Sequence, residues 1–166
     1  MTTIFEKIKE ENMISNIYKR ITITLLFPVI ILMSFNTRPD DNLVVIVSSK
    51  NPIGTLTLSQ TKDIYLRKAS KRWKEMNVNI IPLDVRGESE SKNTFLSKVL
   101  QMSKVEMYRY FAEREYQNQE QPPVRLYSDS DIIKFVQENS SAIGYVMNSS
   151  IVDAKGIKII CSVPLN

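Results

Sequence analysis

The sequence contains no histidine and a single cysteine, and these two shortages exclude several kinds of site. Without histidine the chain cannot build a Ser-His-Asp triad or a metal site with imidazole ligands. Because Cys161 is alone, neither an internal disulfide nor a cysteine cluster for zinc can form. It lies inside the apolar run IKIICSV, which favours a buried strand residue over a reactive thiol. We therefore expect neither a metal nor a cofactor.

The composition fits one globular domain with a mild positive charge. The chain has 166 residues, of which 43% are apolar and 24% charged. From Leu43 to the end, 17 lysines and arginines face 13 acidic residues, which gives a net charge of +4. This excess favours an anionic ligand slightly but is far below that of a nucleic-acid-binding domain, so we expect no nucleic-acid partner.

The N-terminal part has the pattern of an export signal. Lys19 and Arg20 precede ITITLLFPVIILMSF, which is shorter than the run of about 20 apolar residues that a spanning helix needs. No A-x-A-like cleavage site follows, so an uncleaved membrane anchor remains an alternative. A start at Met13 would leave the shorter basic leader MISNIYKR. We predict an export signal or membrane segment over residues 1–35, a linker over 36–42, a domain over 43–166, and a periplasmic or exported location.

Within the domain, predicted strands alternate with predicted helices. Strands are predicted at Leu43–Ser49, Asn79–Val85, Val124–Ser128, Ala142–Met147 and the final GIKIICSV. Helices are predicted from Leu58 with Ser59 as N-cap, after Ser89 or Ser91, from Ser103 with Val105, Tyr108 and Ala112 at helical spacing, and from Ser130-Asp131. This alternation predicts an α/β domain with a mostly parallel sheet flanked by helices.

Three segments, in this order and spacing, resemble the second lobe of periplasmic phosphate-binding proteins of ABC transporters. They are NPIGTLTLSQTKDIYLRKASKRW, NIIPLDVRGESESKNTF and SDIIKFVQENSSAIGYV. More closely, the chain resembles the short, single-lobe phosphate ABC transporter substrate-binding proteins, and the resemblance covers nearly all of residues 51–146. It implies a single lobe of the type II periplasmic binding protein fold. It also implies that Trp73 packs in the core, that the cations around it form a solvated rim, and that a glycine usually occupies the position of Arg67.

The resemblance implies a binding site for phosphate or a similar small oxyanion at Arg86, Ser89 and Ser91. The physical basis is general, because free amides and the positive dipole at a helix start attract anions, and a guanidinium adds a charge-assisted fork. Two departures matter: the turn is one residue shorter than the family pattern, and Glu90, beside Glu88, replaces a glycine. Like-charge repulsion opposes an anion unless both glutamate side chains point to solvent. The alternative is that the serines only cap the helix.

Ser48 and Ser49, together with Thr55, follow the first predicted strand and are further candidates for the same anion site, because ligands of open α/β sheets gather at the carboxyl ends of strands. A single lobe supplies only half of a ligand's enclosure, so we expect weak binding, or a second wall from a second copy or from a membrane or periplasmic protein. The alternative is an interaction module that kept the fold and lost the ligand. Catalysis is not expected, because the sequence gives no reason to bring Asp63, Asp84 or Glu88 together.

Overall fold

The structure is a computed structural model, and it describes residues 42–165 apart from residues 70 and 119. The predicted export signal and, except for Asn42, the predicted linker lie outside the described residues. Within the described part, no helix combines the length and apolar character needed to span a bilayer. The elements follow one another as β1 (Leu43–Ser48), α2 (Leu58–Tyr65), β2 (Arg72–Trp73), β3 (Val78–Asn79), β4 (Ile81–Val85), α3 (Glu90–Thr94), the π-helical turn η1 (Phe95–Leu100), α4 (Lys104–Asn118), β5 (Val124–Leu126), α5 (Asp129–Glu138), β6 (Ala142–Met147), the 3-10 turn η2 (Asn148–Ile151) and β7 (Ile157–Val163).

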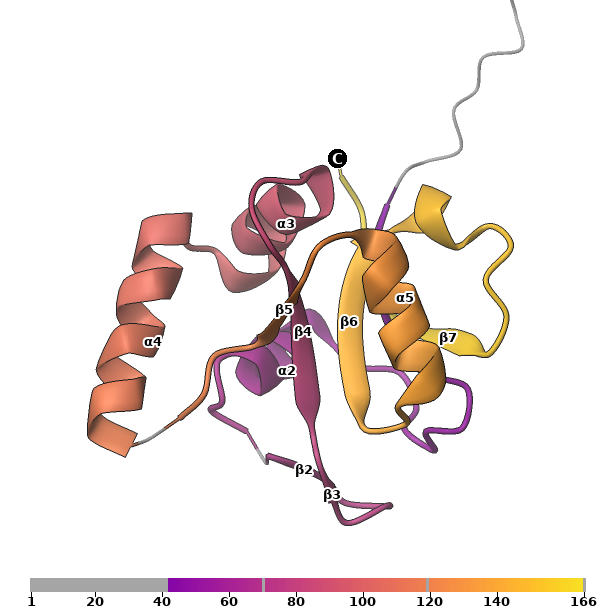
Figure 1. The fold of residues 1–166 in the computed structure, drawn as a ribbon, viewed down its shortest axis with the longest axis horizontal. Helices are drawn as coiled ribbons and strands as arrows, with labels where there is room; N and C mark the ends of the chain where they lie inside the picture. The colour runs from indigo at the N-terminus through magenta and orange to yellow at the C-terminus, as the bar shows by residue number, and fades with distance from the viewer. Residues whose placement is uncertain (1–41, 70, 119, 166) are drawn as a thin grey trace, which may run out of the picture. The chain divides into compact units, whose positions relative to one another are not determined.

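The main sheet has the strand order β5-β4-β6-β1-β7 (Figure 1). Strand β4 is parallel to both β5 and β6, whereas β1 is antiparallel to β6 and to β7. Four of these strands therefore run in one direction and β1 runs against them. The predicted mostly parallel sheet is confirmed, but the reversed direction of β1 was not foreseen.

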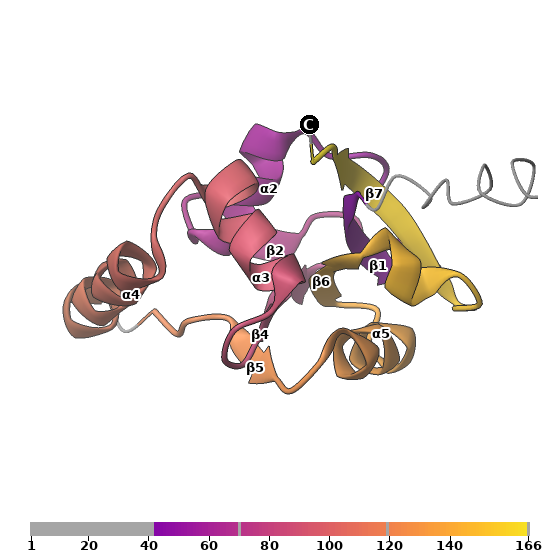
Figure 2. The same ribbon diagram turned by 90° about the horizontal axis from the view of Figure 1, so that it is seen from above.

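Helices cover both faces of this sheet, with α2 and α3 on one face and α5 on the other (Figure 2). Every residue of β1 and of β6 is buried, as expected for apolar runs in the middle of a two-sided sheet. The apolar side chains of α5 that meet the sheet include Ile132 and Val136, both fully buried.

The helix starts follow hydroxyl caps, although two of them differ from the prediction. Thr57 rather than Ser59 caps α2, in a capping box with Gln60. Ser128 caps α5, which begins before the predicted Ser130. Ser89 caps α3, as one of the two predicted alternatives. Because several hydroxyl side chains lie near the start of each helix, the sequence predicts the N-cap position only to within one or two residues.

Trp73 is a core residue, as the resemblance implied. Its side chain is 3% exposed, and its indole Nε1 donates to the carbonyl of Ser141 at 2.9 Å. It lies in a small hairpin, β2–β3, that the sequence did not predict. The nearby Lys68 and Lys74 are exposed, so the solvated rim is also confirmed.

Arg67 differs from the other cations around Trp73. It is half-buried, has a φ of 56°, and donates from Nη1 to the carbonyl of Ile80 at 3.2 Å. Burial lowers the pKa of its guanidinium. The left-handed conformation explains why a glycine suits this position in the resembling family.

A buried ion pair joins the end of β4 to the start of α3. The Lys92 ammonium, which is fully buried, donates to Asp84 Oδ2 at 2.9 Å and to the carbonyl of Val85 at 2.8 Å. The Tyr145 hydroxyl from β6 donates to Asp84 Oδ1. Burial and the Asp84 charge raise the pKa of Tyr145 far above its ordinary value, so this hydroxyl stays a donor at any pH at which the protein folds.

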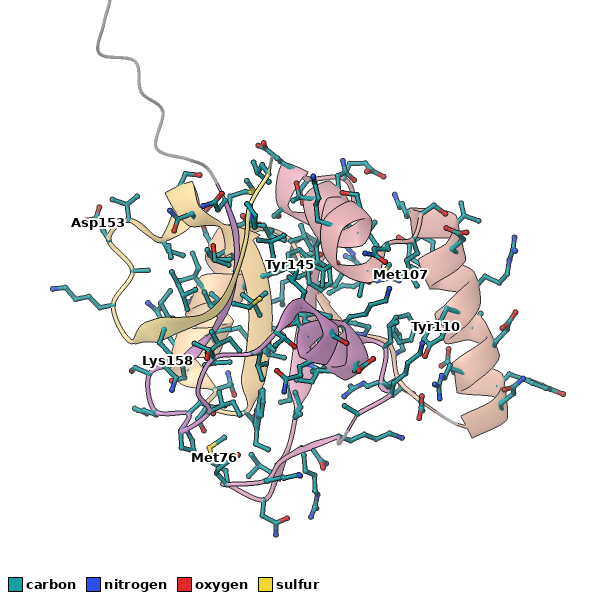
Figure 3. All side chains as sticks on the ribbon, turned by 180° about the vertical axis from the view of Figure 1, so that it is seen from behind. Met76, Met107, Tyr110, Tyr145, Asp153 and Lys158 are labelled. Atoms are coloured by element: carbon teal, nitrogen blue, oxygen red, sulfur yellow. The ribbon has the colours of Figure 1, made fainter. Side chains whose placement is uncertain are left out.

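An aromatic cluster includes Tyr145, which binds this ion pair. The rings of Phe95 and Tyr145 stack with centroids 4.0 Å apart, and Tyr65 meets Phe95 at 4.5 Å. Tyr145 lies at the centre of the domain in Figure 3. Both partners of the ion pair are buried, which strengthens the attraction between Lys92 and Asp84 and makes the loss of either partner costly.

We expect Gly144→Ala to destabilise the protein by about 1–3 kcal/mol, because a Cβ at this position would overlap Ile132 Cγ2 and push α5 away from β6. Gly54→Ala is the matched control, since its Cβ would meet no heavy atom within 4 Å. Urea unfolding of both variants measures the difference. Equal stability of the two would contradict this packing.

We expect Lys92→Met to destabilise the protein by about 3–5 kcal/mol, because it leaves the Asp84 carboxylate buried without its main partner. The double variant Lys92→Met/Asp84→Leu removes both charges and should recover much of that loss. Chemical denaturation of the single and double variants is the measurement. A double variant as unstable as the sum of the two single variants would show that the pair is not coupled.

Candidate functional site

A pocket of about 340 Å³ opens beyond the carboxyl ends of β4, β5 and β6. Ligands of α/β sheets gather at such an edge, so this is the first place to look for a site. The pocket is lined mainly by short hydroxyl and acidic side chains, among them Glu88, Ser89, Glu90, Ser91, Tyr127, Ser128, Asp129 and Ser150.

The turn that follows β4 forms one wall of the pocket. Gly87 has a φ of 82°, which reverses the chain between Arg86 and Glu88. Ser89 Oγ accepts a hydrogen bond from the amide of Lys92 at 3.1 Å and lies 3.1 Å from Ser91 Oγ. The two predicted serines are thus brought together at the start of α3, where the first amides have no carbonyl partner within the helix.

Asp129 is the central acidic residue of the pocket, and the sequence reading did not single it out. Its Oδ1 accepts from the hydroxyl of the buried Ser91 at 2.7 Å. Its Oδ2 accepts from the amide of Met147 at 3.0 Å and from the Ser150 hydroxyl at 3.3 Å. Asp129 therefore ties α3, α5 and the end of β6 together. The only signal in the sequence was an acidic residue directly after the hydroxyl Ser128, which is ordinary for a helix start.

Arg86 stands at the rim and does not line the pocket. Its Nη1 donates to the Tyr127 hydroxyl at 3.0 Å, and its guanidinium carbon lies 5.1 Å from the centre of the Tyr127 ring. Both side chains are exposed. A rotation of the Arg86 side chain could therefore bring the cation over the pocket at the cost of one exposed stacking contact of about 0.5–1 kcal/mol.

The two glutamates of the turn have different surroundings. Glu88 forms an ion pair with Lys104 of α4, and this hydrogen bond lowers the pKa of the Glu88 carboxyl and raises the pKa of the Lys104 ammonium. Glu90 is exposed and borders the pocket. Both glutamates line the pocket, so Glu88, Glu90 and Asp129 together give it a negative lining.

Ser48 and Ser49 do not belong to this site, which corrects the expectation from the sequence. Val47 of β1 pairs with Ile143, near the start of β6, and the Ser49 amide donates to Gly156 before β7. Because β1 runs against the other strands, its carboxyl end lies at their amino ends. The two serines are therefore at the opposite edge of the sheet from Arg86. Thr55 was a candidate because it follows the same strand, so the direction of β1 removes that reason for placing it at the pocket.

The three carboxylates considered for catalysis are not brought together. Asp84 is buried against Lys92, and Glu88 is paired with Lys104 on the surface. Asp63 borders a different pocket, beside Trp73. Among the residues that the structure describes, no cluster of three acidic or cysteine side chains could hold a metal ion.

Comparisons with known proteins give the fold. Neither a protein-family profile nor a curated protein sequence matches the chain. Among solved structures, an ABC-type phosphate transport receptor from Vibrio cholerae matches with a TM-score of 0.55 and 23% identity, over 72% of this chain and 45% of the receptor. A phosphate ABC transporter substrate-binding protein with bound phosphate from Clostridium perfringens matches with a TM-score of 0.53 and 22% identity, over 75% and 55%. PstS from Borrelia burgdorferi matches with a TM-score of 0.55 and 18% identity, over 72% and 46%.

The chain spans about half the length of each of these proteins, which is the extent of one lobe. At these identities the likeness concerns the fold. The chain thus has the fold of a single lobe of the type II periplasmic binding proteins, as found in phosphate ABC transporter substrate-binding proteins.

Proposed function

We propose that this lobe is an exported solute-binding domain that binds phosphate or a similar small oxyanion without covalent chemistry, at Arg86, Ser89 and Ser91. The observation that carries the proposal is the pocket at the first turn of α3, where two serine hydroxyls meet and Arg86 stands at the rim. Free amides at that turn, the hydroxyls and the guanidinium are the donors that a tetrahedral anion requires. The similar solved structures are transport proteins, which favours binding over catalysis.

The negative lining restricts which oxyanion fits. Asp129 only accepts hydrogen bonds while it is ionised, and an anion without a hydrogen of its own would meet repulsion there. An oxyanion that keeps an O–H group, such as monohydrogen or dihydrogen phosphate, can donate to Asp129 in place of Ser91. The Ser91 hydroxyl is then free to donate to the anion. Phosphate therefore suits the pocket better than sulfate.

The open pocket also restricts the affinity. One lobe covers one side of the ligand, and solvent reaches the other side. Tight binding would need a second wall, for which a membrane or periplasmic protein is the candidate partner. Alone, the lobe should bind phosphate weakly, because fewer contacts offset the entropy lost on association.

We expect calorimetry of the protein at neutral pH to show heat with millimolar phosphate and much less with sulfate. Arg86→Ala should weaken phosphate binding about tenfold or more, since a hydrogen bond to a charged group contributes about 1.5–3 kcal/mol. Ser49→Ala is the matched control, because Ser49 is exposed at the opposite edge of the sheet. Absence of heat together with an unchanged melting temperature in phosphate would contradict the proposal.

One observation favours a second candidate function, an interaction module without a small ligand. In the structure Asp129 already accepts the Ser91 hydroxyl, and Glu90 borders the same pocket, so the module can satisfy its polar groups by itself. The exposed cations around Trp73 would then be the natural contact for an acidic partner protein.

For the interaction module we expect the charge-reversing pair Lys68→Glu/Lys74→Glu to abolish capture of an acidic partner protein in pull-downs, while Arg86→Ala leaves it intact. Lys98→Glu, a reversal at one exposed lysine of η1, is the control, and it is compared with each of the single variants Lys68→Glu and Lys74→Glu. Loss of capture in all three variants would point to general charge attraction and contradict a defined surface.

A further inference from the structure

Helix α4 is joined to the rest of the domain by its side chains. Among the residues that the structure describes, no backbone hydrogen bond connects α4 to another element. The apolar part of the contact comes from Met107, which faces the other elements in Figure 3, and from Phe111, and both are buried. In both ribbon views the helix stands at the margin of the domain (Figures 1 and 2). Its attachment therefore depends on a small number of specific contacts.

The start of α4 is hydrogen-bonded without help from its neighbours. The Ser103 amide donates to Glu106 Oε2 at 2.7 Å, and the Glu106 amide donates to Ser103 Oγ at 3.2 Å. This reciprocal arrangement is a capping box, and the other backbone hydrogen bonds of an α-helix are internal to it. We therefore expect α4 to move as one unit when its side-chain contacts open.

The first half of α4 contacts the buried ion pair of Lys92 and Asp84. The centre of the Tyr108 ring lies 6.0 Å from the Lys92 ammonium and 4.8 Å from the guanidinium carbon of Arg125. Arg125 Nε in turn lies 3.9 Å from Asp84 Oδ2. Tyr108 thus contacts both cations that face Asp84. The ring is itself 36% exposed, whereas Lys92 has no exposed surface.

The other end of α4 is held by a buried carboxylate. Glu120, which follows the helix, is 8% exposed. Its Oε1 lies 2.7 Å from Lys71 Nζ, and its Oε2 lies 3.2 Å from Arg114 Nη1 of α4. The nearby charge of Arg67 attracts the same carboxylate. We call these four residues the Glu120 cluster, and they connect α4 to the segment between α2 and β2.

Arg114 extends the Glu120 cluster to the backbone after α2. Its Nε donates to the Tyr110 hydroxyl at 2.9 Å, and this hydroxyl donates to the carbonyl of Leu66 at 2.7 Å. The contacts therefore run from Glu120 through Arg114 and Tyr110 to the turn that contains Leu66. Because hydrogen bonds between charged groups are stronger than neutral ones, the charge of Glu120 is the main support of this chain of contacts.

We propose that α4 is a cover that docks and undocks as a unit over the buried pair of Lys92 and Asp84, and that the Glu120 cluster holds it in the docked state. Met107 and Phe111 supply part of the docking energy, and the charged contacts supply the rest. Elements with few buried apolar contacts open at a lower free energy than the core of a domain. The central strands of the sheet, which are buried throughout, stay folded when α4 opens.

The open state has a consequence for the pocket, although the proposal does not depend on oxyanion binding. Lys104, the first residue of α4, is paired with Glu88, which lines the pocket. When α4 undocks, Glu88 loses this cation and Lys92 becomes hydrated, so the turn after β4 loses two of its contacts. Docking of α4 therefore favours one shape of the pocket, and a molecule that binds this shape favours docking in return.

The first test is native-state hydrogen exchange of the full chain, measured for individual amides. The central amides of α4 should exchange through one shared opening, at least about tenfold more often than the amides of β6 and with a smaller dependence on urea. Exchange of α4 and β6 through the same opening would overturn the proposal, because α4 would then separate only when the whole domain unfolds.

The second test concerns the Glu120 cluster. Glu120→Gln removes the charge and keeps the shape of the side chain, and it should raise the opening constant of α4 about tenfold, as expected when hydrogen bonds lose a charged acceptor. Glu115→Gln is the matched control, since Glu115 is an exposed residue of the same helix. An equal effect of the two variants would overturn the role of Glu120. Melting temperatures check that both variants fold.

The third test asks whether α4 covers the ion pair, by acylation of lysines with a succinimidyl ester and mass mapping of the products. Lys92 is buried and should react only in the open state, so its labelling should follow α4 exchange, both in urea and in Glu120→Gln. The exposed Lys98 of η1 corrects for the activity of the reagent. Labelling of Lys92 with the urea dependence of β6 exchange would overturn the proposal, because the pair would then open only on global unfolding.

Discussion

The buried pair of Lys92 and Asp84 fixes the geometry on which the candidate site depends. It connects the last residues of β4 to the first turn of α3, and the Tyr145 hydroxyl holds the same carboxylate from β6. A buried ion pair contributes little net stability compared with apolar residues of similar size, but it penalises every arrangement that separates its partners. The turn between Val85 and Ser89 is therefore held at both of its ends, whereas its middle, at Gly87, has no such anchor.

The same turn also shows how an anion site can be maintained without its ligand. Hydroxyls and amides that would bind an oxyanion need acceptors when the oxyanion is absent, because an unsatisfied buried donor costs about 1–3 kcal/mol. Asp129 supplies such an acceptor to the buried Ser91, and its second oxygen is occupied by Met147 and Ser150. A ligand must compete with this internal carboxylate, which connects the two candidate functions: the same hydrogen bond that satisfies the empty pocket opposes an anion.

The sequence predicted the parts of the fold that depend on local pattern. The apolar runs of β1 and β6, the alternation with helices and the cap at Ser89 follow from burial and from hydroxyl chemistry within a few residues. The direction of β1 does not, because it is set by the neighbours with which the strand pairs, far away in the chain. Ser48 and Ser49 were assigned to the wrong edge for that reason alone.

The sequence also did not predict the contacts between elements that are distant along the chain. Asp129 is an ordinary first-turn acid in the sequence, and only the packing of α5 against α3 makes it part of the pocket. In α4, the spacing of Val105, Tyr108 and Ala112 predicted a helix correctly, but Met107 and Phe111 are the residues that reach the core. A helix with apolar residues on two sides does not reveal from its own sequence which side faces inward.

The π-helical turn over Phe95–Leu100 has a bearing on how this lobe tolerates changes in length. Such a turn holds one residue more than an α-helical turn between its hydrogen-bonded groups. The resemblance implies that the segment between Arg86 and Ser89 is one residue shorter than the family pattern. A wider turn further along the chain can accommodate such a deletion without rotating Val99 and Leu100 out of the interior. The length of the loop at the pocket can therefore vary while the sheet and helices beneath it stay unchanged.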